Sequence, residues 1–322
     1  MTPREIIIAN MEFRCEDRIG FNFTLGDRLD DFCWTWCEHA IETEKWEKDG
    51  FEYSTDIWGN TWHRIIGMSS GGEIFEPVIR DWSQLDDLKL PDLANPDNFK
   101  TARDFGASDT DRFRVCMIDW PFSICRYMRK MEVYFVDLIQ ERARIDVLHD
   151  RVTSLLEAVI DQVGAAGLDG IMFCEDLGIQ DRLLMSPPMW RDIFRPLYER
   201  LTSRAHGHGL KVIQHSCGYN WLLLDDLCGA GIDCLQFDQP CVYELPALAE
   251  KLRGHGVGLF SPCDIQKVLP TADRAFIESE CERMVETLRG GLIVKNYPDL
   301  HGIGVDPEWD AWAYDTFVRV GM

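Results

Sequence analysis

From residue 113 onward, the chain alternates short apolar runs with longer amphipathic segments. The apolar runs occupy residues 113–118, 170–174, 210–214, 234–237, 256–260 and 291–294. The amphipathic segments occupy residues 122–131, 144–164, 188–207, 221–230, 243–252 and 272–288. This alternation predicts an α/β fold in which helices cover both faces of a parallel sheet. The number of units favours a closed TIM (β/α)8 barrel over an open sheet.

The first third of the chain has a different pattern, which predicts an α+β extension. A helix is expected to open near residues 6–13. Short strand-like runs at residues 51–56 and 61–66 meet at Gly59-Asn60, a hairpin signal, and Gly71-Gly72 predicts a further turn. No linker rich in Pro, Ser or Gly divides the chain. We therefore interpret residues 1–322 as a single domain, with an N-terminal extension and hairpin at 1–110 and the main barrel at 111–322.

Charge and cysteine content narrow the possible partners and the compartment. The chain has 33 Lys and Arg against 55 Asp and Glu, a net charge of −22, which disfavours nucleic acid and anionic membranes as partners. No signal peptide and no membrane-spanning apolar run is visible. The 12 cysteines are not spaced as a disulfide framework. We expect a cytoplasmic protein with reduced thiols and room for a metal site.

Candidate chemistry follows the predicted strands, at the edge where TIM barrels place their active sites. His215 and Cys217 are two residues apart on extended chain, so their side chains point the same way. Glu175 ends the strand before, and Cys263 ends the strand two units on. An imidazole, two thiolates and a carboxylate from neighbouring strands predict a catalytic zinc site with an exchangeable position.

Further polar and aromatic residues follow the same strand ends or lie in the extension. Glu175 and Asp176 are the candidate catalytic acids, and Asp264 is a candidate to orient a metal ligand. The residues expected to line or cover the substrate pocket are Trp58, Trp62, Trp120, Gln180, Gln239 and His301. Structural roles remain open for some of these residues: Cys263 as a small buried thiol, Glu175-Asp176 as a helix cap, and the tryptophans as packing.

At these residues the sequence resembles the uroporphyrinogen decarboxylase superfamily. The matching pieces are Gly167-Leu-Asp-Gly-Ile-Met-Phe-Cys-Glu-Asp-Leu-Gly-Ile-Gln, Met185-Ser-Pro, His215-Ser-Cys-Gly, Gly231-Ile-Asp-Cys-Leu and Cys263-Asp-Ile-Gln. The resemblance covers the chain from about Tyr53 onward and implies a TIM barrel. The superfamily holds the haem-pathway decarboxylase and corrinoid-linked methyltransferases.

Two features place the sequence nearer the methyltransferases. The decarboxylase's N-terminal motif, Met-Arg-Gln-Ala-Gly-Arg-Tyr, is absent, whereas the His-x-Cys-Gly of the methyltransferases is present at His215 and Cys217. In the coenzyme M methyltransferases a third zinc ligand, a Cys, lies near the last strand. Here that strand is followed by Lys295-Asn296-Tyr297, so Cys263 would have to substitute. The resemblance thus favours relatives that demethylate a substrate over those that methylate a thiol.

Together these observations give a specific hypothesis. The chain is interpreted as a zinc-dependent O-demethylase component that takes a methyl group from a small substrate, an O-methylated aromatic. The acceptor would be the reduced cobalt of a corrinoid (cobalamin) on a partner protein. Three alternatives stay open: a methylcorrinoid-to-thiol or -pterin methyltransferase, a decarboxylase of the uroporphyrinogen type, and a non-catalytic binding barrel.

Overall fold

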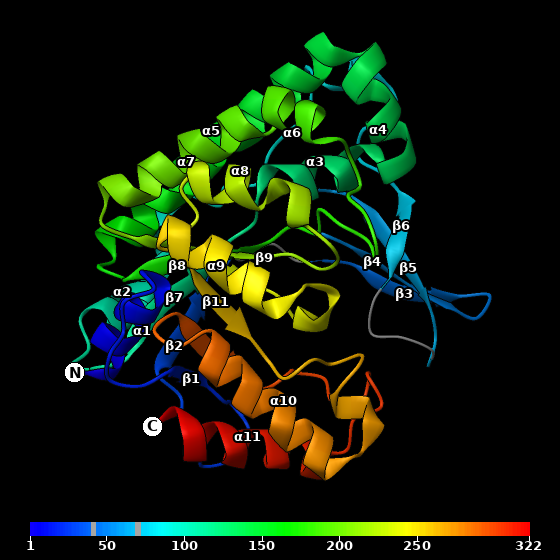
Figure 1. The fold of residues 1–322 in the computed structure, drawn as a ribbon. Helices are drawn as coiled ribbons and strands as arrows, with labels where there is room; N and C mark the ends of the chain where they lie inside the picture. Colours follow the sequence, from blue (N-terminus) through cyan, green and yellow to red (C-terminus); the bar gives the residue numbers. More distant parts are fainter. Residues whose placement is uncertain (40–42, 68–71) are drawn as a thin grey trace.

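Eight parallel strands surrounded by helices form a barrel in the computed structural model, which describes residues 1–39, 43–67 and 72–322 (Figure 1). The hydrogen-bonded order around the barrel is β1-β12-β11-β10-β9-β8-β7-β2. The bounds are β1 (Gly20–Asn22), β2 (Phe32–Trp36), β7 (Phe113–Met117), β8 (Gly170–Cys174), β9 (Lys211–His215), β10 (Cys234–Gln236), β11 (Gly258–Ser261) and β12 (Leu292–Lys295). The predicted TIM-barrel class is confirmed, and each of the six apolar runs forms one strand.

The barrel also uses part of the segment that the sequence pattern assigns to the extension. Strands β1 and β2 both precede residue 111, and β2 pairs with β7 in parallel. The Asp31 backbone N–H donates to the Phe21 carbonyl at 2.8 Å, which links the chain entering β2 to β1. This contact brings the two edges of the sheet together, although no strand ladder joins β1 to β2 among the described residues.

The interior of the barrel is filled by apolar side chains. Helix α1 (Pro3–Met11) closes the end of the barrel at which the strands begin. Phe32 of β2 stacks on Phe260 of β11 with ring centroids 5.4 Å apart. Ile7 and Met11 of α1 belong to the same buried cluster. A Cβ on Gly258 would lie 2.5 Å from the Asn10 carbonyl oxygen, so glycine lets α1 pack against β11. The chemistry is therefore confined to the opposite end, where the strands finish.

The other helices cover the outside of the barrel (Figure 1). They are α2 (Lys100–Gly106), α3 (Pro121–Arg129), α4 (Met131–Gln140), α5 (Arg142–Ala165), α6 (Pro187–Ile193), α7 (Arg195–Gly207), α8 (Leu224–Gly229), α9 (Leu245–His255), α10 (Arg274–Thr287) and α11 (Pro307–Gly321). The amphipathic segment 188–207 is two helices rather than one, because Pro196 has no N–H to continue the first. Helices α4 and α11 lie outside the segments predicted from the sequence.

A four-stranded antiparallel sheet lies beside the barrel, on the side of α3 and α4 (Figure 1). Its strands are β3 (Lys45–Lys48), β4 (Phe51–Thr55), β5 (Thr61–Ile65) and β6 (Glu73–Glu76). The hairpin predicted at Gly59-Asn60 is confirmed, with Gly59 at a φ of 90°. Gly71 of the other predicted turn lies outside the described residues. Among the described helices, none is long and apolar enough to cross a membrane.

A candidate metal centre at the barrel mouth

Side chains at the ends of β8 and β9 alternate between the barrel mouth and the surrounding helix layer. Ile213 of β9 packs in the barrel interior, so His215 and Cys217, two and four residues later, point into the mouth. Met172 of β8 also packs inside, which brings Asp176, four residues later, to the same mouth. The alternation therefore selects three residues with metal-binding side chains from two neighbouring strands.

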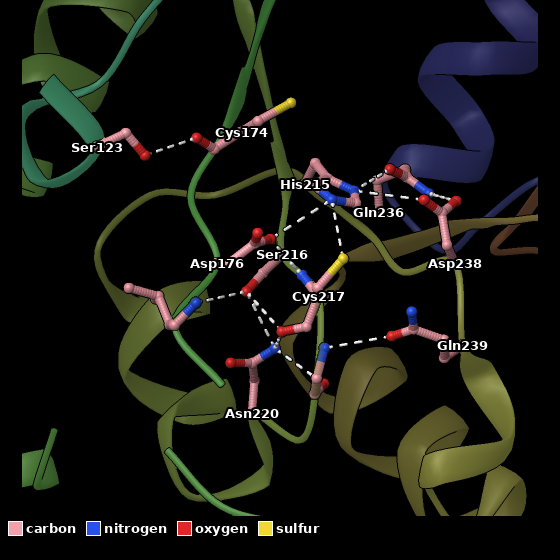
Figure 2. Close-up of polar contacts among 12 residues, drawn as sticks. Ser123, Cys174, Asp176, His215, Ser216, Cys217, Asn220, Gln236, Asp238 and Gln239 are labelled. Atoms are coloured by element: carbon pink, nitrogen blue, oxygen red, sulfur yellow. Dashed lines mark hydrogen bonds and ion pairs between the residues drawn. The ribbon is translucent and has the colours of Figure 1, made fainter. Parts of the chain in front are cut away.

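Asp176, His215 and Cys217 form a compact cluster (Figure 2). One ligand atom from each lies within 4.8 Å of the others. The Cys217 sulfur is 3.4 Å from His215 Nε2, and Asp176 Oδ1 is 3.6 Å from the same nitrogen. Burial, followed by the nearby charges of Asp176 and Asp238, raises the pKa of the Cys217 thiol to about 12. A cation bound to the cluster would favour the thiolate form of Cys217.

The loops after β8 and β9 are tied together around the cluster. The Cys217 backbone N–H donates to Asp176 Oδ1 at 2.8 Å, and the Leu177 N–H donates to the Ser216 hydroxyl at 3.1 Å (Figure 2). Gly218 has a φ of +79°, and a Cβ there would lie 2.5 Å from the Gly178 carbonyl carbon. Only glycine allows this approach, so Gly218 lets the loop that carries Cys217 pack against the loop after β8.

A chain of side chains from the next strands orients His215 (Figure 2). The Gln236 amide nitrogen donates to Asp238 Oδ1 at 2.7 Å, and Lys295 Nζ donates to the same oxygen at 3.1 Å. A carboxylate accepts but cannot donate, so Gln236 must turn its amide oxygen toward His215. That oxygen hydrogen-bonds His215 Nδ1, which must therefore carry the proton. The lone pair of Nε2 is left facing Asp176 and Cys217.

Glu175, expected as a ligand or catalytic acid, faces the helix layer rather than the mouth. Its carboxyl is fully buried and accepts hydrogen bonds from the Ser123 N–H at 2.9 Å and the Tyr198 hydroxyl at 2.5 Å. Burial raises the pKa of Glu175 to about 7, against the lowering effect of these donors. Ser123 lies in the first turn of α3, so Glu175 stabilises that helix N-terminus.

Cys263, expected as a third protein ligand, also points away from the cluster. Phe260 of β11 faces the barrel interior, so Cys263, three residues later, faces the helices, where it is buried against α10. A hydrogen bond with the Cys281 thiol of α10, together with burial, raises the pKa of Cys263 well above its usual value. Asp264 accepts the backbone N–H groups of Cys241 and Gln266, so it links the segment after β10 to its own loop after β11. The structure does not bring Cys263 or Glu175 to His215 and Cys217.

The three tryptophans expected over the substrate lie in different places. Trp120 is completely buried, and its ring stacks on that of Phe173 with the ring centroids 3.8 Å apart. Trp62 belongs to strand β5 of the antiparallel sheet. Trp58 is also buried, and its indole N–H hydrogen-bonds the Asp119 carboxylate at the end of β7.

The remaining predicted pocket residues lie in loops. Gln180 and Tyr219 line a groove formed by the segments after β8, β9 and β10. The Gln239 amide oxygen accepts the Gly218 N–H at 3.3 Å, so Gln239 supports the loop that carries Cys217 (Figure 2). His301 is exposed in the loop after β12.

Sequence reasoning did not select two residues that face the mouth. Gln236 and Cys174 are the last residues of β10 and β8, and both pair in register with His215. Burial raises the pKa of the Cys174 thiol to about 12, although the thiol remains open to water in the mouth. Side chains two residues apart on a strand share a face, so the inward-facing positions of β8 and β10 at the level of His215 could have identified both residues.

An eight-stranded barrel with an Asp, His and Cys cluster at its carboxyl mouth defines a TIM-barrel protein with a candidate metal-dependent active site. The profile of the family described as "Uroporphyrinogen decarboxylase (URO-D)" matches residues 67–296, which is 230 of the 322 residues. The chain belongs to the uroporphyrinogen decarboxylase family, as its motifs indicate.

Solved structures share the fold at low sequence identity. The chain is similar to a "methyltransferase from Methanosarcina mazei", with 14% identity and a TM-score of 0.68 over 99% of this chain and 98% of that one. It is also similar to a D-psicose 3-epimerase, with 10% identity and a TM-score of 0.44 over 74% of this chain and 85% of that one. The first similarity shows the fold alone, and the second is too weak to bear on function. No curated protein matches the chain.

Proposed function

We propose that this chain is a zinc-dependent methyltransferase that demethylates a small O-methylated aromatic compound and passes the methyl group to a corrinoid protein. The observation that carries the proposal is the Asp176, His215 and Cys217 cluster at the barrel mouth. The family includes corrinoid-linked methyltransferases that the sequence resembles at these positions. The full-length similarity in fold to a methyltransferase is consistent with this assignment.

The chemistry and spacing of the three side chains fit zinc. One sulfur, one imidazole nitrogen and one carboxylate oxygen form a three-ligand set of the kind that catalytic zinc sites use, with a further position left for substrate. Zinc bond lengths and tetrahedral angles require donor atoms about 3.3–3.6 Å apart. The two separations from His215 Nε2, 3.4 Å and 3.6 Å, match this requirement, and the third, between Asp176 and Cys217, is at most 4.8 Å.

The chain's own residues would orient the ligands and set the charge of the mouth. Gln236, Asp238 and Lys295 hold His215 with Nε2 available, and Gly218 lets the Cys217 loop approach Asp176. Zinc bound there would act as a Lewis acid on the ether oxygen, stabilising the charge that develops as the methyl group leaves. A reduced corrinoid on a partner protein would supply the methyl acceptor.

The charge of the mouth disfavours a polycarboxylate substrate. Lys295 faces the mouth, but its ammonium is already paired with Asp238 at 3.1 Å. A cavity at the rim of the mouth has no Lys or Arg among its described lining residues. Each carboxylate buried without a partner costs several kcal/mol, so a tetrapyrrole acid would bind poorly.

The test is an anaerobic methyl-transfer assay with reduced cobalamin as acceptor, followed by the change in cobalamin absorbance. The zinc-loaded protein is expected to methylate cobalamin with 2-methoxyphenol as donor. Cys217→Ala should abolish this activity, because it removes one of the three ligands. Cys228→Ala, at a half-buried thiol of α8, is the matched control and should retain it.

Two results would contradict the proposal. Turnover that persists after chelation, or in Cys217→Ala, would separate methyl transfer from the cluster. Decarboxylation of a porphyrinogen without transfer from any methyl ether would replace this function by that of the decarboxylase branch.

A further inference from the structure

A second feature of the rim is a cavity of about 270 Å³ at the ends of β2 and β7, facing α5. Most of its lining is apolar, including Ile57, Leu93, Leu156 and Val159. A cavity of roughly 150 Å³ is enough to hold benzene. This cavity therefore accommodates a compound with one substituted aromatic ring.

The polar end of the cavity is formed by Asp119 and His39. The Asp119 side chain is exposed to solvent and lines the cavity. Burial raises its pKa, although the Trp58 indole N–H donates to it. The buried His39 Nδ1 has no hydrogen-bond partner among the described residues. A ligand that fills the cavity would thus meet one carboxyl with spare acceptor capacity and one imidazole.

The strand register connects this cavity with the metal cluster. Met117 of β7 pairs with Met172 of β8, so Asp119, two residues later, reaches the level of Cys174. Cys174 in turn pairs with His215. Two strand spacings separate Asp119 from His215, roughly 10 Å at 4.8 Å per strand. The Cys174 thiol between them feels the charges of both Asp119 and Asp176.

The charge of the cavity limits what the ring can carry. An anionic substituent would meet the Asp119 carboxyl with no Lys or Arg among the described lining residues. Asp119 is the one carboxyl among the described lining residues, and the nearby Asp56 already accepts from Trp58 N, Asn60 N, Asn60 Nδ2 and Trp62 Nε1. A single hydroxyl matches the one carboxyl that is available.

We propose that this cavity binds the aromatic ring of the methyl donor, with a phenolic hydroxyl donating a hydrogen bond to Asp119. The substrate class is then a one-ring methoxyphenol, rather than a fully methylated or a carboxylated ring. This assignment rests on the proposed function, because the cluster two strands away in the register defines where the methyl group would lie. Asp119 acts in it as a specificity-determining residue.

Calorimetric titration of the zinc-loaded protein with single-ring probes tests the proposal by binding alone. 2-Methoxyphenol should bind roughly 10- to 100-fold more tightly than methoxybenzene, as expected for a hydrogen bond to a charged group. 4-Methoxybenzoate and 4-methoxybenzylamine should both bind more weakly than 2-methoxyphenol. Tighter binding of the acid or the amine would overturn the hydroxyl assignment.

Two variants locate the site, and a third is the control. Asp119→Leu should abolish the preference for 2-methoxyphenol while keeping methoxybenzene binding and zinc content. Leu156→Phe should fill the cavity and remove binding of both rings. Ile139→Phe, at an exposed position of α4, should bind as the parent does. Full preference for 2-methoxyphenol in Asp119→Leu, or full binding in Leu156→Phe, would overturn the pocket assignment.

The binding and transfer assays separate the two proposals. Methyl transfer that is unaffected in Asp119→Leu would overturn the pocket and leave the proposed function standing. Tight, Asp119-dependent binding of 2-methoxyphenol without transfer to reduced cobalamin would do the reverse.

Discussion

At the scale of single residues, the direction of each side chain decides which residues can bind a metal. Asp176, His215 and Cys217 point into the mouth, whereas Glu175 and Cys263 are each one residue out of phase and face the helices. The sequence predicts the His215 and Cys217 pair, because two residues of one strand share a direction whatever the register. The sequence does not predict whether Glu175 or Asp176 faces His215 and Cys217, since that depends on the register between β8 and β9.

Substitution of Cys217 and of Cys263 should affect bound zinc differently. Cys217→Ala should lose bound zinc, because its sulfur is one of three ligands in the cluster. Cys263→Ala should keep zinc at the level of the parent and lose only a little stability, because its thiol contacts Cys281. Metal analysis of the anaerobically purified variants measures both, and zinc loss in Cys263→Ala would contradict the assignment.

The second residue-scale prediction concerns the amide that fixes the His215 ring. Gln236→Leu should weaken zinc binding roughly 10- to 100-fold, as substitutions of groups that orient metal ligands do. Gln214→Leu is the matched control, because Gln214 is equally buried but faces Tyr198 in the helix layer. Competition with a chromogenic chelator measures both affinities. Equal affinities in the two variants would exclude an orienting role for Gln236.

At the scale of elements, the strands of the main barrel follow from the sequence and the loops between them do not. Each predicted run from 113 to 294 forms a strand because its apolar residues are buried on both faces of the sheet. Strands β1 and β2 were not predicted as barrel strands, since β1 is three residues long and both lie outside the strand–helix rhythm. The cavity beside Asp119 was not predicted either, because residues 57 and 93 reach it only in the folded chain.

The loops that carry the cluster give the element-scale prediction. Gly218→Ala should destabilise the protein by about 2–3 kcal/mol, because alanine is strained at a φ of +79° and its Cβ would contact Gly178. It should also weaken zinc binding by shifting Cys217. Gly207→Ala, at the end of α7 with no atom within 4 Å of the added Cβ, should leave stability unchanged or raise it slightly. Urea unfolding distinguishes the two, and equal losses would contradict the assigned role of Gly218.

At the scale of the whole molecule, a buried histidine makes stability depend on pH. His149 of α5 is 2% exposed, and its Nε2 is 2.6 Å from the Tyr134 hydroxyl. Burial lowers the pKa of His149 from 6.5 to about 4. Between these values the unfolded chain binds a proton that the folded chain does not, so stability is complete above pH 6.5 and falls as the pH decreases.

The pH dependence of stability should therefore differ between the parent protein and a variant that lacks His149. From pH 6.5 to 4 the parent should lose about 3 kcal/mol through His149, in addition to the effects of other titrating groups. His149→Gln cannot titrate and should lose less over the same interval. Urea midpoints measured across this range should therefore converge as the pH falls. Parallel curves for the parent and the variant would show that His149 does not control this dependence.

The proposed function depends on a zinc ion held at the barrel mouth by Asp176, His215 and Cys217. X-ray absorption at the zinc edge of the anaerobically purified protein probes this ion most directly, because sulfur and the lighter ligand atoms lie at different distances. We predict about one zinc per chain, with a single sulfur near 2.3 Å and nitrogen or oxygen ligands near 2.0–2.1 Å. Absence of zinc, or two or more sulfur ligands, would contradict it.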